Sequence, residues 1–174
     1  MGKVLLIGLV FISCGVSAQN DPRIGVYTGA GLPDLIALGG KYQKGQLEGG
    51  LYYGTNPFYN SDPDNSLYTT GGHFIWHFGG TSNHLVARPW YLRTDLIYYF
   101  EENRRYIWHI VASGFRIGRE FAFTEKLSVQ FDLGTAFYMS EKQITKDATG
   151  GSGWDISPDL PFLPAGSIIF FAGW

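Results

Sequence analysis

The stretch Leu127–Met139, LSVQFDLGTAFYM, decides the fold class because the character of its side chains alternates along its whole length. Odd-numbered positions carry mainly large apolar side chains, whereas even-numbered positions carry mainly small or polar ones. Successive side chains of a β-strand point to opposite faces of the sheet, so this pattern predicts a strand with one apolar face. The stretch is also longer than the ~5–6 residues that are usual for a strand in a soluble protein.

The same two-residue period recurs along most of the chain, and no helical period of useful length competes with it. In residues 105–121, Trp108 shares a phase with the charged Arg116, and a β-bulge near Ser113–Gly114 would reconcile the two halves. We therefore expect an all-β fold, a closed antiparallel up-and-down transmembrane β-barrel of about eight strands. The predicted strands cover residues 23–30, 35–43, 46–54, 67–78, 90–101, 105–121, 126–141 and 164–174.

The amino-acid composition excludes several classes of protein. The chain has 174 residues with 24 glycines, 17% aromatic residues, 16% charged residues and a formal net charge of −2. This length suits one domain, and so much glycine and aromatic content with so little charge argues against disorder, coiled coils and helical bundles. Because there is no basic run, we expect no nucleic-acid partner.

The first 18 residues read as a cleaved signal peptide, followed by a barrel domain over residues 19–174. Lys3 supplies a positive start, residues 4–16 are almost wholly apolar, and Ala18 ends a small-x-small cleavage site. Lipid attachment at Cys14 is the alternative, although the preceding residues make a poor lipobox. Cys14 is the only cysteine, so the mature chain would have no disulfide, thiol nucleophile or thiolate metal site.

The polar faces of the predicted strands indicate which side points outward. These faces carry mainly small residues and few charges, whereas a water-exposed surface needs many lysines and glutamates. A basic residue facing lipid at the bilayer midplane costs about 2–4 kcal/mol, so the mid-strand charges should point inward and pair. The expected polar network of the lumen comprises Lys41, Glu48, Arg93, Asp95 and Asp132. A soluble barrel with its apolar face inward is the alternative arrangement.

With its leader, its alternating strands and its C-terminal strand SIIFFAGW (residues 167–174), the chain resembles the small eight-stranded outer-membrane β-barrel proteins of Gram-negative bacteria. The resemblance implies an outer-membrane location, with lipid and lipopolysaccharide around the barrel. We also expect a monomer without a cofactor. The resemblance also implies that Trp174 is read by the barrel-assembly machinery, although Ala172 stands where a second aromatic residue is common. Eight strands leave an interior that side chains can just fill, so we expect a plugged polar lumen.

We expect a structural or surface-binding role rather than catalysis. The acidic and aromatic loop around Trp154 could contact a partner. A lipid A-modifying hydrolase is the first alternative, with Ser82 and His84 as candidate nucleophile and base. In the lipid A deacylase family, however, the histidine precedes the serine. A secreted lipid-binding barrel is the second alternative.

We expect no metal site. His73 and His77 share a face, but four residues of strand separate them by about 13 Å, which is too far for one metal ion. The alternating oxygen ligands Asn60, Asp62 and Asp64 lack the remaining features of an EF-hand loop.

Overall fold

The computed structural model describes residues 22–85, 87–146 and 162–173. The predicted signal peptide, the alternative lipidation site Cys14, the Trp154 loop and the predicted assembly signal Trp174 lie outside these residues. In the described part of the chain, no helix is both long enough and apolar enough to cross a membrane.

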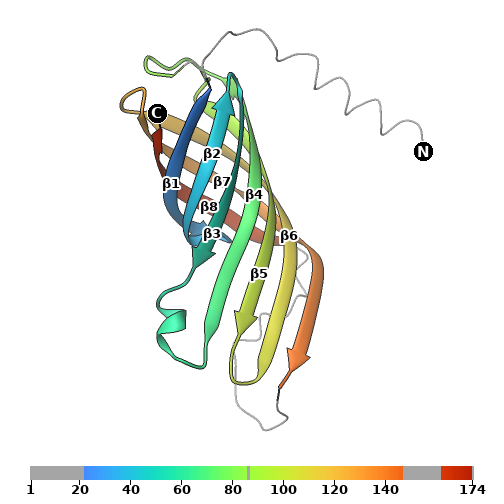
Figure 1. The fold of residues 1–174 in the computed structure, drawn as a ribbon. Coiled ribbons are helices and arrows are strands. Elements are labelled where there is room, and N and C mark those ends of the chain that lie inside the picture. The colour runs from blue at the N-terminus through green and yellow to red at the C-terminus, as the bar shows by residue number, and fades with distance from the viewer. Residues whose placement is uncertain (1–21, 86, 147–161, 174) are drawn as a thin grey trace, which may run out of the picture.

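The described residues form a closed antiparallel barrel of eight strands, which confirms the predicted fold class. Each strand pairs with the next one in the sequence, and β8 pairs with β1 to close the sheet. The elements are β1 (Arg23–Leu32), β2 (Leu35–Lys44), β3 (Leu47–Thr55), η1 (Tyr59–Ser61), β4 (Ser66–Gly79), β5 (Trp90–Glu102), β6 (Tyr106–Ala122), β7 (Leu127–Thr145) and β8 (Phe162–Gly173). Figure 1 shows the strands tilted around a common axis.

The two ends of the barrel differ. One end carries the β2–β3, β4–β5 and β6–β7 connections, and we call it the turn end. The other end carries η1 and the β5–β6 connection, and we call it the loop end. The wall is short on one side, because β1, β2 and β3 have 9 or 10 residues whereas β6 and β7 have 17 and 19. In Figure 1 the β1–β2 hairpin therefore ends well short of β4, β5 and β6.

Side chains on the polar faces point into the barrel, and those on the apolar faces point out of it. On β7, Asp132 is 4% exposed and the next residue, Leu133, is 73% exposed. On β5, Arg93 is 2% exposed while Leu92 is 46% exposed. The alternation that predicts the strands thus also separates a polar interior from an apolar outer surface.

The bulge expected near Ser113–Gly114 of β6 is wrong in position. Trp108 and Arg116 are both buried, so β6 keeps one phase along its length. The extra residue is Met139 of β7, which the pairing skips opposite Val111–Ala112. The prediction failed because it assumed that a large indole would face outward, whereas the interior accepts Trp108 near the loop end.

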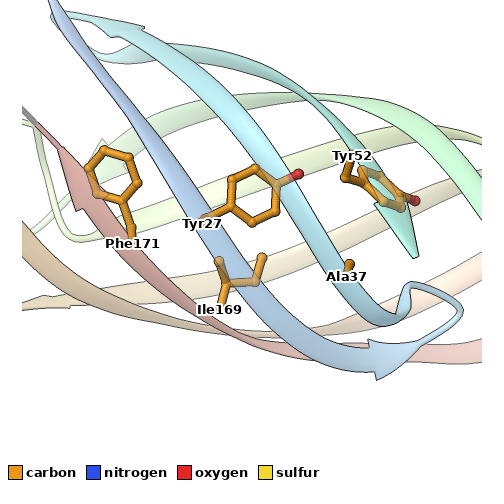
Figure 2. Close-up of a cluster of buried hydrophobic side chains, with 5 residues drawn as sticks. All are labelled: Tyr27, Ala37, Tyr52, Ile169 and Phe171. Carbon is orange, nitrogen blue, oxygen red and sulfur yellow. The ribbon is translucent and has the colours of Figure 1, made fainter. Parts of the chain in front are cut away.

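Inside the sheet, tyrosines stand opposite glycines. An inward tyrosine ring lies over the backbone of a glycine on the adjacent strand, which leaves room for the ring in a narrow barrel. The pairs are Tyr27 with Gly39, Tyr52 with Gly71, and Tyr91 with Gly118. Figure 2 shows the buried apolar cluster that two of these tyrosines join, formed by Tyr27, Ala37, Tyr52, Ile169 and Phe171.

Candidate functional site in the barrel lumen

Two arginines lie side by side at the centre of the lumen. Arg93 of β5 is the direct cross-strand partner of Arg116 of β6, and each is 2% exposed. Asp95 lies between their guanidinium groups. Its Oδ1 accepts a hydrogen bond from Arg93 Nε at 2.7 Å, and its Oδ2 accepts one from Arg116 Nε at 3.0 Å. Residues two apart on a strand share a face, so Arg93 and Asp95 both reach the lumen.

Two further carboxylates complete this central cluster. Asp34, from the short β1–β2 turn, accepts a two-point hydrogen bond from Arg116 with N–O distances of 2.7 and 2.8 Å. Arg93 Nη2 donates to the same carboxylate at 3.2 Å. Asp132 of β7 lies 3.4 Å from Arg93 and 3.3 Å from Arg116. Such charge-assisted, two-point pairs are the strongest protein hydrogen bonds.

Neutral hydroxyl groups donate further hydrogen bonds to oxygens that already accept from the arginines. The Tyr52 hydroxyl donates to Asp34 at 3.0 Å, and the Tyr91 hydroxyl donates to Asp132 at 3.3 Å. The Ser167 hydroxyl donates to Asp132 at 2.8 Å. A buried ion cluster is tolerated only when its polar atoms are satisfied, and these hydroxyl groups supply part of that satisfaction.

The ion pairs hold Asp34 in its charged form. Burial by itself raises the pKa of the Asp34 carboxyl, but the charge of Arg93 and the hydrogen bond from Arg116 outweigh it. The result is a pKa of about 2, lowered from the ordinary 3.8. Asp34 is therefore a carboxylate over the whole physiological pH range and acts as a structural counter-ion rather than a proton donor.

A second charged cluster lies toward the turn end. Lys41 Nζ donates to Glu48 Oε2 at 2.8 Å, and its ammonium group also lies 3.9 Å from the centre of the Phe171 ring. Two imidazoles approach the same carboxylate. His73 Nε2 lies 3.6 Å from Glu48 Oε1, and His77 Nε2 lies 3.7 Å from Glu48 Oε2. All four charged or titratable groups are buried.

A set of donors in this turn-end cluster has the composition of a metal site. One donor atom from each of Glu48, His77 and Glu120 lies within 4.8 Å of the other two. The structure thus places His77 beside two carboxylates, and both imidazoles approach the Glu48 carboxylate. The Ser128 hydroxyl donates a short hydrogen bond to Glu120. The His77 Nδ1 atom lies 2.7 Å from the backbone carbonyl of Arg88.

The lumen residues predicted from the sequence all lie inside the barrel, but in two groups. Arg93, Asp95 and Asp132 meet in the central cluster, and Lys41 and Glu48 meet in the turn-end cluster. Among the described residues, no ion pair joins the two groups directly. The lumen therefore has two separate layers of charge rather than one network.

Ser82 and His84, the candidate residues of the hydrolase alternative, lie in the β4–β5 connection at the turn end. The Ser82 hydroxyl oxygen accepts backbone N–H groups from His84 at 3.3 Å and from Leu85 at 3.1 Å. The hydroxyl thus organises a local turn, and the His84 side chain is exposed. Among the described contacts, none joins the Ser82 hydroxyl to the His84 imidazole.

Sequence reasoning missed three of the buried charged residues in the described lumen: Asp34, Arg116 and Glu120. Asp34 lies in a turn, where alternation carries no information about direction. Arg116 is the cross-strand partner of Arg93, and Glu120 lies on the same face of β6. The misplaced bulge left open whether these two side chains point into the barrel or out of it. The even-numbered glycines of β6 were the available signal, because Gly114 and Gly118 mark its inward face.

The lumen is thus built from two buried layers of charge within a sheet whose outer face is apolar. No family model, curated protein or solved structure matches this chain.

Proposed function

We propose that the protein is an integral outer-membrane β-barrel with a plugged polar lumen and a structural or surface-binding role. One observation supports this most strongly: every strand presents a large apolar side chain on its outer face. Representative residues and their exposed fractions are Ile24 (51%), Leu38 (65%), Leu51 (73%), Phe74 (48%), Leu96 (58%), Phe115 (60%), Leu133 (73%) and Phe170 (57%). Together they surround the barrel.

Such a surface suits lipid better than water. Soluble monomers rarely expose contiguous apolar patches larger than a few hundred Å². A closed barrel also meets the main requirement of the bilayer core, because each strand pairs with a neighbour on both sides and the sheet has no free edge strand. The shortest strands have 9 or 10 residues, close to the roughly 9–11 that a tilted strand needs to cross.

The filled lumen argues for a role other than solute diffusion. Arg93 and Arg116 project into the centre of a barrel of only eight strands, and both form ion pairs with carboxylates. Open aqueous pores need about 16–18 strands. The ion cluster therefore acts as an internal brace that joins β5, β6 and β7 to the β1–β2 turn.

The loop end supports the surface-binding part of the proposal. Tyr59 of η1 donates a hydrogen bond to Glu101 at 2.8 Å, and Arg104 pairs with Asp64 at 2.6 Å. Lys146 forms a short ion pair with Glu102. These contacts tie the ends of separate hairpins together, and connections fixed on a rigid scaffold are common binding surfaces.

Membrane fractionation and gel mobility test the proposal together. We expect the untagged protein to sediment with outer membranes and to need detergent for extraction. We also expect the unheated sample to run differently from the boiled sample, because a closed barrel resists detergent until it is heated. A protein released without detergent and showing no heat-dependent shift would contradict the proposal and favour the soluble barrel.

A further inference from the structure

Three metal-ligating side chains converge at the turn end of the lumen from three different strands. They are Glu48 of β3, His77 of β4 and Glu120 of β6. One donor atom from each lies within 4.8 Å of the other two. Their exposed fractions are 1%, 1% and 2%, so water does not compete freely for these atoms.

Each of these three groups has one polar atom engaged and another left without a hydrogen-bond partner. The engaged atoms are Glu48 Oε2, held by Lys41, His77 Nδ1, facing the Arg88 carbonyl, and Glu120 Oε1, held by Ser128. Glu48 Oε1, His77 Nε2 and Glu120 Oε2 are buried and unpartnered among the described residues. Glu48 Oε1 lies 3.6 Å from His73 Nε2, and His77 Nε2 lies 3.7 Å from Glu48 Oε2, and both separations are too long for a hydrogen bond. Buried polar atoms rarely stay unpaired, so these atoms point to a missing partner.

The position of the His77 proton favours an ion at the other ring nitrogen. The Arg88 carbonyl can only accept, so Nδ1 must donate to it, and a neutral imidazole then presents the lone pair of Nε2 toward the carboxylates. A metal-ligating histidine almost always donates its second ring N–H to a carbonyl or carboxylate in this way. The Ser128 hydroxyl orients Glu120 in the corresponding manner.

Charge gives a further reason. Lys41 compensates Glu48, and His73 and His77 are the other basic side chains that approach Glu48 among the described residues. No basic side chain contacts Glu120 among the same residues, and its nearest recorded partner is the Ser128 hydroxyl. An uncompensated carboxylate that is fully desolvated is costly. A divalent cation between the two carboxylates would compensate Glu120 and change the net charge of Lys41, Glu48 and Glu120 from −1 to +1.

We propose that Glu48, His77 and Glu120 form a binding site for a divalent transition-metal ion of the Zn²⁺ type. An imidazole with two carboxylates is a donor set that such ions accept, whereas Ca²⁺ and Mg²⁺ prefer oxygen ligands alone. Zn²⁺ lies about 2.0–2.2 Å from such ligands. Donor atoms within 4.8 Å of one another could reach this distance if each side chain moved by less than about 1 Å, and the ion would then join β3, β4 and β6 at the turn end.

Metal binding by the untagged full chain tests this inference. The protein is refolded in detergent after treatment with EDTA, with and without ZnCl₂, then desalted and analysed for metal content and thermal unfolding. We expect about one Zn²⁺ per chain and a higher unfolding temperature with ZnCl₂. His77→Gln and Glu120→Gln should each weaken binding at least by the roughly 10–100-fold that loss of an outer-sphere partner costs.

His109→Gln is the matched control, because His109 lies on β6 near the loop end and bonds to the Tyr98 hydroxyl instead. This variant should bind Zn²⁺ like the wild type. A heat-dependent gel shift establishes that each variant has folded. The inference is overturned if the wild type retains no Zn²⁺ and gains no thermal stability from it, a result that needs no variant to fold. It is equally overturned if His77→Gln binds as tightly as the wild type.

Discussion

Asp34 joins the short wall of the barrel to its long wall. It lies in the β1–β2 turn, yet its carboxylate contacts Arg93 of β5 and Arg116 of β6 on the opposite side of the lumen. A residue on a longer hairpin would lie beyond the arginines rather than level with them. The short β1–β2 hairpin therefore places its turn level with the paired arginines, and the turn supplies the third carboxylate of the central cluster.

The low pKa of Asp34 makes the stability of the barrel depend on pH in a defined window. The folded pKa of about 2 lies below the ordinary 3.8, so the unfolded chain binds more protons between these values. The Asp34 contribution is then fully present above pH ~4 and is lost as the pH falls toward 2. The shift corresponds to roughly 2 kcal/mol. We expect urea unfolding of refolded protein to show this loss on acidification.

Asp34→Asn provides the control for this prediction. The variant leaves two buried guanidinium groups under-compensated, so it should be less stable than the wild type at neutral pH by about 3–5 kcal/mol. The difference between the two proteins should narrow by roughly 2 kcal/mol from pH 5 to pH 2, because the wild type loses the same interaction. A difference that stays constant over this range would contradict the assigned role of Asp34.

Alternation predicts the direction of residues in strands but not in turns. Arg93, Asp95 and Asp132 lie inside the barrel as their positions on the polar faces predict. Asp34 could not be found in this way, since its direction depends on the length of the β1–β2 hairpin relative to its neighbours. The approach of His77 to Glu120 was also invisible, because the closeness of β4 and β6 inside the lumen is a property of the closed sheet.

At the scale of the strand, pairing a tyrosine with a glycine across two strands sets the space inside the barrel. Tyr91 of β5 stands opposite Gly118 of β6, and a Cβ atom at Gly118 would lie 2.3 Å from the Tyr91 ring. It would also lie 2.6 Å from the backbone oxygen of Phe131. The ring and the sheet would both have to move, and the Tyr91 hydrogen bond to Asp132 would move with them.

Gly118→Ala should therefore destabilise the barrel by about 1–3 kcal/mol, the usual cost of inserting a group into a packed interior. Gly40→Ala is the matched substitution on the outer side of β2, where the nearest atom to a Cβ lies 3.8 Å away. It should be neutral or stabilising by up to about 1 kcal/mol. Urea unfolding of both variants checks the pair, and equal effects would mean that the inward tyrosine does not need the glycine.

The strand boundaries show what the sequence pattern could and could not resolve. Seven of the predicted segments end within two residues of the observed strands, because turn residues mark those limits. β7 instead continues to Thr145, where the residues after Met139 are polar and exposed. Backbone pairing with β6 persists there after the alternation has ended. Hydrophobic pattern reports the apolar part of a strand, whereas hydrogen bonding decides its full length.

At the scale of the whole molecule, the barrel reverses the usual arrangement of a soluble protein. Its interior holds charged and hydroxyl side chains, and its outer surface carries aliphatic and aromatic ones. Two layers of ion pairs hold the strands together from within, one at the centre and one near the turn end. The central claim of the proposed function is that lipid covers this outer face.

The most direct test places a charge on that face at two depths. Leu133, 73% exposed, lies in the middle of the apolar part of β7, and Met139, 64% exposed, lies six residues nearer the loop end. In lipid vesicles, Leu133→Arg should cost about 2–4 kcal/mol of unfolding free energy and Met139→Arg no more than about 1 kcal/mol, since the penalty falls toward the interface. If both variants are as stable as the wild type, lipid does not cover this face and the membrane proposal is wrong.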